Sequence, residues 1–395
     1  MKLDVKKMFL PAAAAKNLAQ ANPAAVAAML DKAIPNVLGV GAGIKWKNGA
    51  PTGEPALIVL VTHKIPKAEV PKASLIPATL QGLKTDVLAV GHIFAADDTD
   101  PEVEDDTDPE VEDDTDPEVE DDTDPEVEDD TDPEVEDDTD PEVEAVRKYF
   151  RARKRRMKRV RPVCGGISVG YRKLTTGTIG ACVYDLLPGA SNDPPQPGTG
   201  FPKKLYILSN NHVLAYSNAG KLGASILQPG AGDGGRLPKD RIGWLRRFIP
   251  LDLTPAIPLG QHNNLVDAAL AEVPFHLLER RIKWIGELRG WRRKADVIVG
   301  TLVKKTGRST KLTTGRITVV NATLDINYRN GRKGRFKEQI LMTNMSAPGD
   351  SGSIITTLDD VAVGLLFAGS TVVTVANQIE NVRALLGVEI AEQVL

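Results

Sequence analysis

The segment MSAPGDSGS, Met345–Ser353, places one serine between glycines and directly after an aspartate. A serine hydroxyl is a poor nucleophile at neutral pH and needs an adjacent base. In a tight turn the N–H groups of Gly349 and Ser351 can point at one oxygen and form an oxyanion hole, and glycine permits the backbone angles of such a turn. The same residues would also suit an ordinary flexible turn. Ser351 is therefore a candidate nucleophile whose base must lie elsewhere in the chain.

The chain has five histidines, and one of them lies where the pattern predicts the end of a strand and the start of a helix. In LYILSNNHVLAYS an apolar run is followed by Asn210 and Asn211, then by His212, then by apolar residues that could begin a short helix. A lone histidine at the end of a strand is often structural. His212 is a candidate general base only if a nucleophile and an orienting carboxylate accompany it.

The candidate carboxylate is Asp267, within NNLVDAALAEV. A carboxylate inside an apolar run costs free energy unless it is paired. It could face solvent from a strand surface, or it could accept the Nδ1–H of a histidine and so fix the imidazole tautomer. Asp252 in PLDLTP is the rival, but a proline-rich loop constrains it less.

The elements that must position these residues have the pattern of a mainly β protein. From about residue 161 to the end, short apolar runs recur between glycine-rich turns, typical of an all-β sandwich or a pair of barrels. A helix is expected at 377–387. Eleven strands are expected, in GGISVG, GTIGACVYD, LYILSN, IGWLRRF, LVDAALAEV, DVIVGTLVKK, GRITVV, LDINY, EQILMTN, SGSIITT and VAVGLLFAG.

The N-terminal part predicts a small α+β domain over residues 1–96. Alanine-rich residues 11–33 have helical spacing, and Pro23 is expected to interrupt this helix and begin a second one. Glycine alternates with β-branched residues in 36–66, and TDVLAVGHI at 85–93 predicts another strand.

The charge is strongly segregated along the 395 residues. From 97 to 144 the octapeptide DDTDPEVE occurs six times without variation and holds 30 of the 53 acidic residues. The remaining 23 acidic residues oppose 49 Lys and Arg, an excess of 26 positive charges. Dense like charge, one valine per repeat and regular proline predict a disordered, solvated linker.

A basic linker, residues 145–160, follows the repeat. VRKYFRARKRRMKRVR, residues 146–161, carries ten Lys or Arg. Three interpretations remain open: intramolecular pairing with the acidic repeat, which is held at high effective concentration; a solvated linker; or nucleic-acid binding through phosphate neutralisation. Nucleic acid is the least favoured partner.

The cysteines and the N-terminal segment give weaker indications of the cellular compartment. Cys164 and Cys182 form no disulfide framework and are either buried thiols or one optional bridge. The N-terminus is a poor signal peptide and no run reaches transmembrane length. We therefore expect a cytoplasmic protein with no membrane partner.

Three segments in order, SNNHVLA, VDAAL and APGDSGS, resemble the chymotrypsin-like (trypsin-fold) serine peptidases. KKTGRSTKLTTGRI at 304–317 resembles a hairpin common in bacterial members, and VGLLFAGS at 363–370 resembles the strand that lines the specificity pocket and pairs with substrate backbone. The resemblance covers about residues 161–395. With GGISVG…TTGTIGACV and LGVGAGIKWKNG…ALIVLVTHK, the chain is most similar to bacterial relatives of the narrow-leaf group of plant trypsin-like peptidases.

This resemblance implies a double β-barrel with the site in the crevice between the barrels. It implies His212 as general base, Asp267 as its orienter and Ser351 as nucleophile, with the oxyanion hole at Gly349 and Ser351. Acyl transfer from a protein or peptide substrate to Ser351 would be followed by hydrolysis, without a metal or organic cofactor. The implied substrate-binding residues are Met345, Phe367, Ala368 and Gly369.

Several positions depart from the family pattern. Ser353 replaces the commoner glycine, and the disulfides of secreted members are absent. Pro162 after Arg161 would block tryptic activation, so Asp350 must find a partner other than a newly cut N-terminus. Because Met345 occupies the pocket position that an acidic residue takes in trypsin-like members, an apolar or small substrate side chain is expected rather than Lys or Arg.

Three function classes follow. The favoured one is an active serine endopeptidase. The alternatives are a peptidase-fold protein that binds without cutting and a polyanion- or nucleic-acid-binding protein that uses its basic surface.

Overall fold

The computed structural model describes residues 4–32, 34–47, 50–95, 158–173, 176–391 and 393. The acidic repeat and the basic linker up to residue 157 lie outside these ranges. Strands predominate in the remainder, as the sequence predicts, and none of the helices among the described residues is long and apolar enough to cross a bilayer.

The first barrel closes because one segment, residues 177–185, pairs with a different strand at each of its ends. β8 pairs with β7 and β9 pairs with β12, and the path continues through β15, β14 and β13 back to β7. Its strands are β7 (Ser168–Tyr171), β8 (Gly177–Thr178), β9 (Ala181–Asp185), β12 (Leu205–Ser209), β13 (Ser225–Leu227), β14 (Arg241–Phe248) and β15 (Ala269–Val273).

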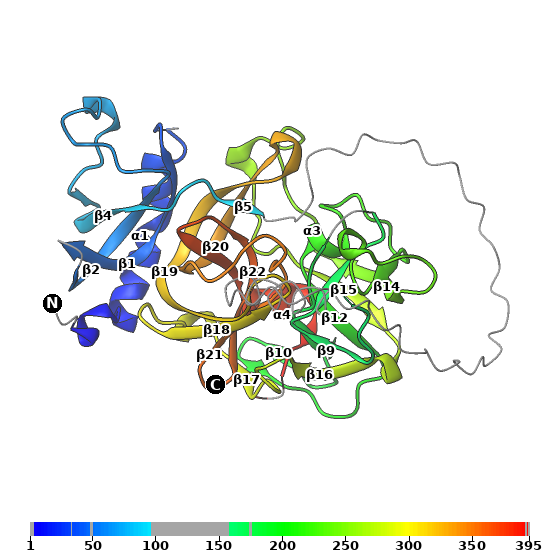
Figure 1. Ribbon diagram of the computed structural model, residues 1–395. Coiled ribbons are helices and arrows are strands. Elements are labelled where there is room, and N and C mark those ends of the chain that lie inside the picture. The colour runs from blue at the N-terminus through cyan, green and yellow to red at the C-terminus, as the bar shows by residue number, and fades with distance from the viewer. Residues whose placement is uncertain are drawn as a thin grey trace, which may run out of the picture. The chain divides into compact units, whose positions relative to one another are not determined.

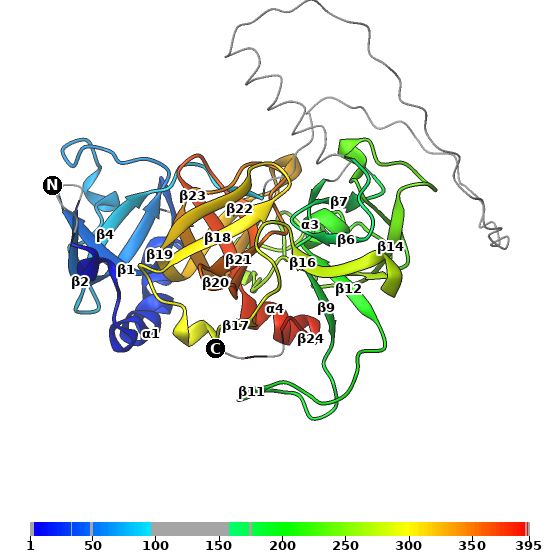
Figure 2. The ribbon, with the colours of Figure 1, turned by 60° about the horizontal axis from the view of Figure 1, so that its bottom comes forward.

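The second barrel is a closed ring in the order β18, β21, β22, β23, β20, β19, with β19 pairing again with β18 (Figure 2). All of these pairings are antiparallel. Its strands are β18 (Leu302–Gly307), β19 (Lys311–Asn327), β20 (Lys333–Thr343), β21 (Ile354–Thr357), β22 (Val361–Gly369) and β23 (Val373–Gln378). The expected pair of barrels is therefore present as two closed rings, each of six members when β8 and β9 are counted as one segment.

The strand β19 differs from the expectation of two separate strands in GRITVV and LDINY. It runs continuously over both, and its register with β20 shifts between Val319 and Ala322. Asn321 has a φ of 49°, so the polar NAT sequence forms a bulge that bends the strand instead of ending it.

The described residues of the N-terminal part form one α-helix and several strands. α1 (Ala12–Met29) is continuous through Pro23, so the expected second helix is wrong; the helix tolerates the missing N–H there. The strands are β1 (Val37–Lys47), β2 (Ala50–Val61), β3 (Thr79–Leu80), β4 (Leu83–Ala89) and β5 (Phe94–Ala95).

These strands extend the sheet of the second barrel, since β1 pairs antiparallel with β19 (Figure 1). The alternating glycines of β1 permit this close approach: a Cβ on Gly39 would lie 2.6 Å from the Cβ of Leu324. One face of α1 packs on β1 and β19, where Leu18 and Met29 join an apolar cluster with Ile317 and Val320. The boundary at residue 96 stays a prediction, but the strands β1 to β5 lie in one sheet with the strands of the second barrel.

The remaining elements are short. The helices are α3 (Asn211–Leu214) and α4 (Ile379–Leu386), the second close to the helix expected at 377–387. The other strands are β6 (Val163–Gly165), β10 (Ser191–Asn192), β11 (Pro195–Gln196), β16 (Leu278–Ile282), β17 (Gly290–Trp291) and β24 (Val388–Glu389). Short 3-10 helices connect several of them, at Val5–Met8, Lys72–Ser74, Ala231–Asp233, Leu259–Gln261, Phe275–Leu277, Lys294–Asp296 and Arg329–Gly331.

Candidate active site

His212 lies in α3, directly after β12 enters the core of the first barrel. Its Nδ1 atom lies 2.7 Å from Oδ2 of Asp267, and its backbone N–H donates to Oδ1 of the same carboxylate at 3.2 Å. An ionised carboxylate can only accept hydrogen bonds, so Nδ1 carries the proton. The neutral imidazole then has Nε2 as its basic nitrogen, as a general base requires.

The carboxylate of Asp267 is fully buried, and His212 is 1% exposed. Burial of this charge is compensated by donors on several elements: besides His212, the Tyr328 hydroxyl donates to Oδ2 at 2.7 Å. The Asp267 backbone is fixed as well. Its N–H donates to Asn377 Oδ1 at 3.0 Å, and its carbonyl accepts from Asn210 Nδ2 at 2.7 Å. A carboxylate held in this way orients the imidazole and supports its protonated form.

Asp252, the alternative carboxylate, forms hydrogen bonds with the backbone and side chains of nearby loop residues. Its Oδ2 accepts from the backbone N–H of Asn263 at 2.9 Å, and its own N–H donates to Asn264 at 2.7 Å. The structure therefore pairs His212 with Asp267 and not with Asp252.

Thr178 of β8 connects the Ser351 backbone with the strand that leads to His212. The backbone N–H of Thr178 donates to the Ser351 carbonyl at 2.8 Å, while the Thr178 carbonyl accepts from Ser209, three residues before His212, at 2.8 Å. A Cβ on Gly177 would lie 2.8 Å from both the Ser351 carbonyl and a methyl group of Val213. The serine loop of the second barrel thus packs against the segment of the first barrel that carries His212.

The loop before Ser351 has fixed peptide planes. The Ser309 hydroxyl donates to the Pro348 carbonyl at 2.6 Å, and the Ser353 backbone N–H and hydroxyl both donate to the Asp350 carbonyl. In a trans peptide the N–H points opposite to the C=O of the same plane. These bonds therefore direct the N–H groups of Gly349 and Ser351 to the other side, which suits an oxyanion hole.

The φ of Gly349 is +92°, a value that side chains other than hydrogen disfavour. A Cβ there would overlap the Arg308 guanidinium and the Ser309 hydroxyl. Glycine at this position is therefore required both by backbone conformation and by space.

Asp350 finds its partner in Lys305 of β18. The Nζ of Lys305 lies 2.9 Å from Oδ2 of Asp350, and both side chains are fully buried. Thr310 donates through its hydroxyl to Oδ2 at 2.6 Å and through its N–H to Oδ1 at 3.1 Å. Burial lowers the pKa of Lys305, opposed by the charge and hydrogen bond of Asp350. An internal ammonium thus anchors the loop without a cut N-terminus.

The expected substrate-binding residues have different environments. Met345 is 4% exposed and belongs to the apolar cluster that includes Ile317. Phe367 is fully buried, and its carbonyl accepts from the Ser351 hydroxyl at 3.5 Å. Ala368 and Gly369 follow it on β22, where they pair with β23 on one side and with β5 on the other.

Sequence reasoning missed Tyr328 and Lys305. Tyr328 is 61 positions from Asp267 in the chain, and no local pattern links them. Lys305 could have been inferred, because alternation along a strand places Lys304 and Lys305 on opposite faces, and Lys305 is the member that faces the interior.

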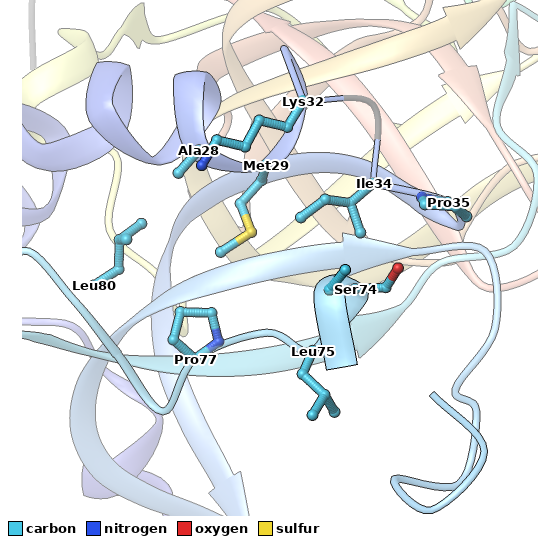
Figure 3. Close-up of a pocket in the computed structure, with 10 residues that line it drawn as sticks. Ala28, Met29, Lys32, Ile34, Pro35, Ser74, Leu75, Pro77 and Leu80 are labelled. Carbon is cyan, nitrogen blue, oxygen red and sulfur yellow. The ribbon is translucent and has the colours of Figure 1, made fainter. Parts of the chain in front are cut away.

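Cavity size does not locate this site. A hollow of about 500 Å³ is formed by the N-terminal part alone, between the end of α1 and residues 73–80 (Figure 3). It is mostly apolar, with Lys32 and Ser74 as its polar residues, and contains none of the candidate catalytic residues.

Neither metal nor disulfide chemistry is indicated in the described part of the chain. Within those ranges no three His, Cys, Asp or Glu side chains are grouped so as to hold a metal ion. Cys164 is half-buried and Cys182 is buried. Burial raises the pKa of Cys164, which disfavours its reactive thiolate form.

Comparison with known proteins gives distant structural similarity to serine proteases. No protein-family model matches the chain, and no curated protein matches it in sequence. A glutamic-acid-specific serine protease is 18% identical, with 58% of this chain and all of that chain covered, at a TM-score of 0.39. Thermobifida fusca protease A is 14% identical over 58% of this chain and 98% of its own, also at 0.39.

The HtrA-type protease AlgW, solved with a decapeptide, is 15% identical over 53% of this chain and 51% of its own, at a TM-score of 0.29. The chain is thus similar in structure to chymotrypsin-like and HtrA-type serine proteases at low identity. TM-scores below 0.5 assign no activity, so function must be inferred from the contacts within this chain.

Proposed function

We propose that this protein is a serine endopeptidase. The observation that carries the proposal is the buried His212–Asp267 pair, with 2.7 Å between Nδ1 and Oδ2, in the segment against which the Ser351 loop packs. His212 takes the proton of the Ser351 hydroxyl as that oxygen attacks a peptide carbonyl. Asp267 holds the imidazole in the required tautomer and supports the imidazolium.

The tetrahedral intermediate places negative charge on the former carbonyl oxygen. The N–H groups of Gly349 and Ser351 stabilise that charge, and the bonds to Pro348 and Asp350 orient them before substrate arrives. His212 then donates its proton to the leaving amine, leaving an ester on Ser351. Water hydrolyses this acyl-enzyme with His212 again as base.

We also place the chain with bacterial relatives of the narrow-leaf group of plant trypsin-like peptidases, on the motifs SNNHVLA, VDAAL and APGDSGS. Met345 supports cleavage after apolar or small side chains, since a thioether offers no charge to a Lys or Arg substrate side chain. We take Ala368 and Gly369 on β22 as the residues whose backbone groups pair with the substrate peptide.

The experiment is hydrolysis of a panel of peptides that differ in one side chain, read by mass spectrometry. The wild type is expected to cleave after small or apolar residues, and Ser351→Ala is expected to lose about 10⁴-fold or more in rate. Equal cleavage by the wild type and Ser351→Ala would contradict the proposal. Strong preference for Arg would contradict only the assignment of specificity.

A further inference from the structure

The strand β22 has an edge beside Ser351. Along one side β23 pairs with it from Gly364 to Gly369. On the other side the pairing with β21 ends near Leu366, whose N–H donates to the Ser353 carbonyl at 2.9 Å. Beyond that point the backbone groups of β22 are available for another strand.

That edge is taken by a segment of the same chain. Ala95 and Phe94 of β5 lie antiparallel to Ala368 and Gly369, respectively, and Figure 1 shows β5 beside β22. An extended peptide adds to a sheet edge through this kind of backbone pairing. The contact is therefore of the kind that a peptide substrate would make at this place.

Contacts on the preceding residues hold β5 in position. The Ile93 carbonyl accepts from the backbone N–H and the side-chain amide of Asn327, both at 3.0 Å, and the Ile93 side chain is fully buried. The Ser370 hydroxyl donates to the Val90 carbonyl at 2.5 Å. Phe94, in contrast, leaves 52% of its surface exposed, and its pairing with Gly369 is a pairing of backbones.

We propose that β5 is an internal ligand of the peptide-binding edge and that free peptides must displace it. This rests on the proposed function in taking Ala368 and Gly369 as the substrate-binding edge. Only one strand can pair with that side of β22 at a time. Because β5 is tethered, its effective concentration is far above that of a free peptide. Ser351 is fully buried and His212 is 1% exposed, as expected of a site that is closed in this conformation.

The proposal predicts competitive behaviour. Displacement of β5 has to precede pairing by a substrate, which raises the apparent KM without changing the chemical step. Weakening the β5–β22 pairing should therefore lower KM and leave kcat unchanged.

The test uses the full chain and acetyl-Ile-Phe-Ala-Ala-4-nitroanilide, which copies residues 93–96. The double variant Phe94→Pro/Ala95→Pro removes both backbone N–H groups of β5. We expect its KM to fall at least tenfold, with kcat within about twofold of the wild type. Phe94→Ala keeps both N–H groups and serves as the matched control, with the KM of the wild type. Equal KM values in all three proteins would overturn the proposal.

A second measurement separates this proposal from the proposed function. If none of the proteins hydrolyses the anilide, the peptidase assignment fails, and amide hydrogen exchange of residues 364–371 still tests the contact. We expect protected Ala368 or Gly369 amides in the wild type and in Phe94→Ala, and at least tenfold faster exchange in the double variant. Identical exchange in a double variant that melts like the wild type would refute the internal ligand.

Discussion

The hydroxyl of Tyr328 donates a hydrogen bond of 2.7 Å to Oδ2 of Asp267, the same oxygen that faces Nδ1 of His212. Tyr328 stands at the end of β19 and stacks on Phe336, with 6.1 Å between ring centroids. Phe336 in turn contacts Phe367 at 4.8 Å. An aromatic column of the second barrel thus fixes a carboxylate that belongs to the first.

Tyr328→Phe removes one donor from a buried carboxylate. Hydrogen bonds to charged groups contribute about 1.5–3 kcal/mol, so we expect a comparable loss in the free energy of unfolding and a fall of about tenfold in kcat/KM. The less stabilised carboxylate binds the imidazolium more strongly, so the acid limb of the kcat/KM profile should move to higher pH.

The matched control for this change is Tyr206→Phe. The Tyr206 hydroxyl also donates to a carboxylate, that of Asp185, at 2.8 Å, and burial together with this bond raises the pKa of Tyr206 to about 12. Its removal should destabilise the fold without moving the acid limb. If the acid limb of the kcat/KM profile moves in neither variant, Tyr328 has a structural role only.

Lys305→Met leaves the buried Asp350 carboxylate without its cation. Breaking a buried pair from one side typically costs about 3–5 kcal/mol, and the serine loop is the part that loses its anchor. We expect a loss of about 3 kcal/mol in urea unfolding and a large fall in kcat. Lys304→Met is the control: Lys304 pairs with Asp360 near the surface, 19% and 25% exposed, and its loss should cost less than about 1 kcal/mol. Equal effects of the two substitutions would contradict the anchoring role.

At alkaline pH, activity and the free energy of unfolding should change in opposite directions. Because burial lowers the pKa of Lys305 below 10.5, the native ammonium loses its proton at a pH where the unfolded chain still holds it. Between those two values the unfolded state binds more protons, so the free energy of unfolding contributed by this group rises with pH. Activity should fall over the same window, because the charge that anchors Asp350 is lost.

The check is kcat/KM and urea unfolding followed up to pH 10.5 in the wild type and in Lys305→Arg. The guanidinium stays charged throughout. The kcat/KM of the variant, divided by its own value at neutral pH, should therefore not fall at alkaline pH. An alkaline limb shared by both proteins would rule out Lys305 as its source.

Gly349→Ala tests the oxyanion loop. The substitution strains a backbone at φ +92° and overlaps Arg308 and Ser309. Loss of one oxyanion donor costs about 10²–10³ in rate, and we expect kcat to fall by that factor with KM little changed. Gly189→Ala has a similar φ of +83° and nothing within 4 Å of the added carbon, so it should cost about 1 kcal/mol of stability and no activity. A Gly349→Ala variant with full kcat would exclude that loop as the oxyanion hole.

Sequence patterns were most informative where local chemistry constrained a residue. Asp267 could be preferred over Asp252 because an apolar run makes an unpaired carboxylate costly, and the structure pairs it with His212. Short apolar runs between turns indicated an all-β sandwich or a pair of barrels, and the resemblance to trypsin-fold peptidases implied the double barrel. Local patterns could not predict contacts between segments that are far apart in the chain. These are the contacts of Tyr328 with Asp267, Lys305 with Asp350, and β5 with β22.

Local signals also misled in two places. Pro23 reads as the start of a second helix, yet α1 continues because packing against β1 and β19 outweighs one missing hydrogen bond. GRITVV and LDINY were expected to form two strands, yet a bulge at Asn321 keeps both within β19. Tertiary contacts decided both outcomes.

The most direct measurement is the intact mass of the protein after incubation with a fluorophosphonate, followed by mapping of the modified peptide. If the hydroxyl of Ser351 is activated by His212, the wild type gains one adduct, located on Ser351, while Ser351→Ala gains none and His212→Ala reacts at least 10³-fold more slowly. An unmodified wild type, or an adduct that forms as fast in His212→Ala, would contradict the account.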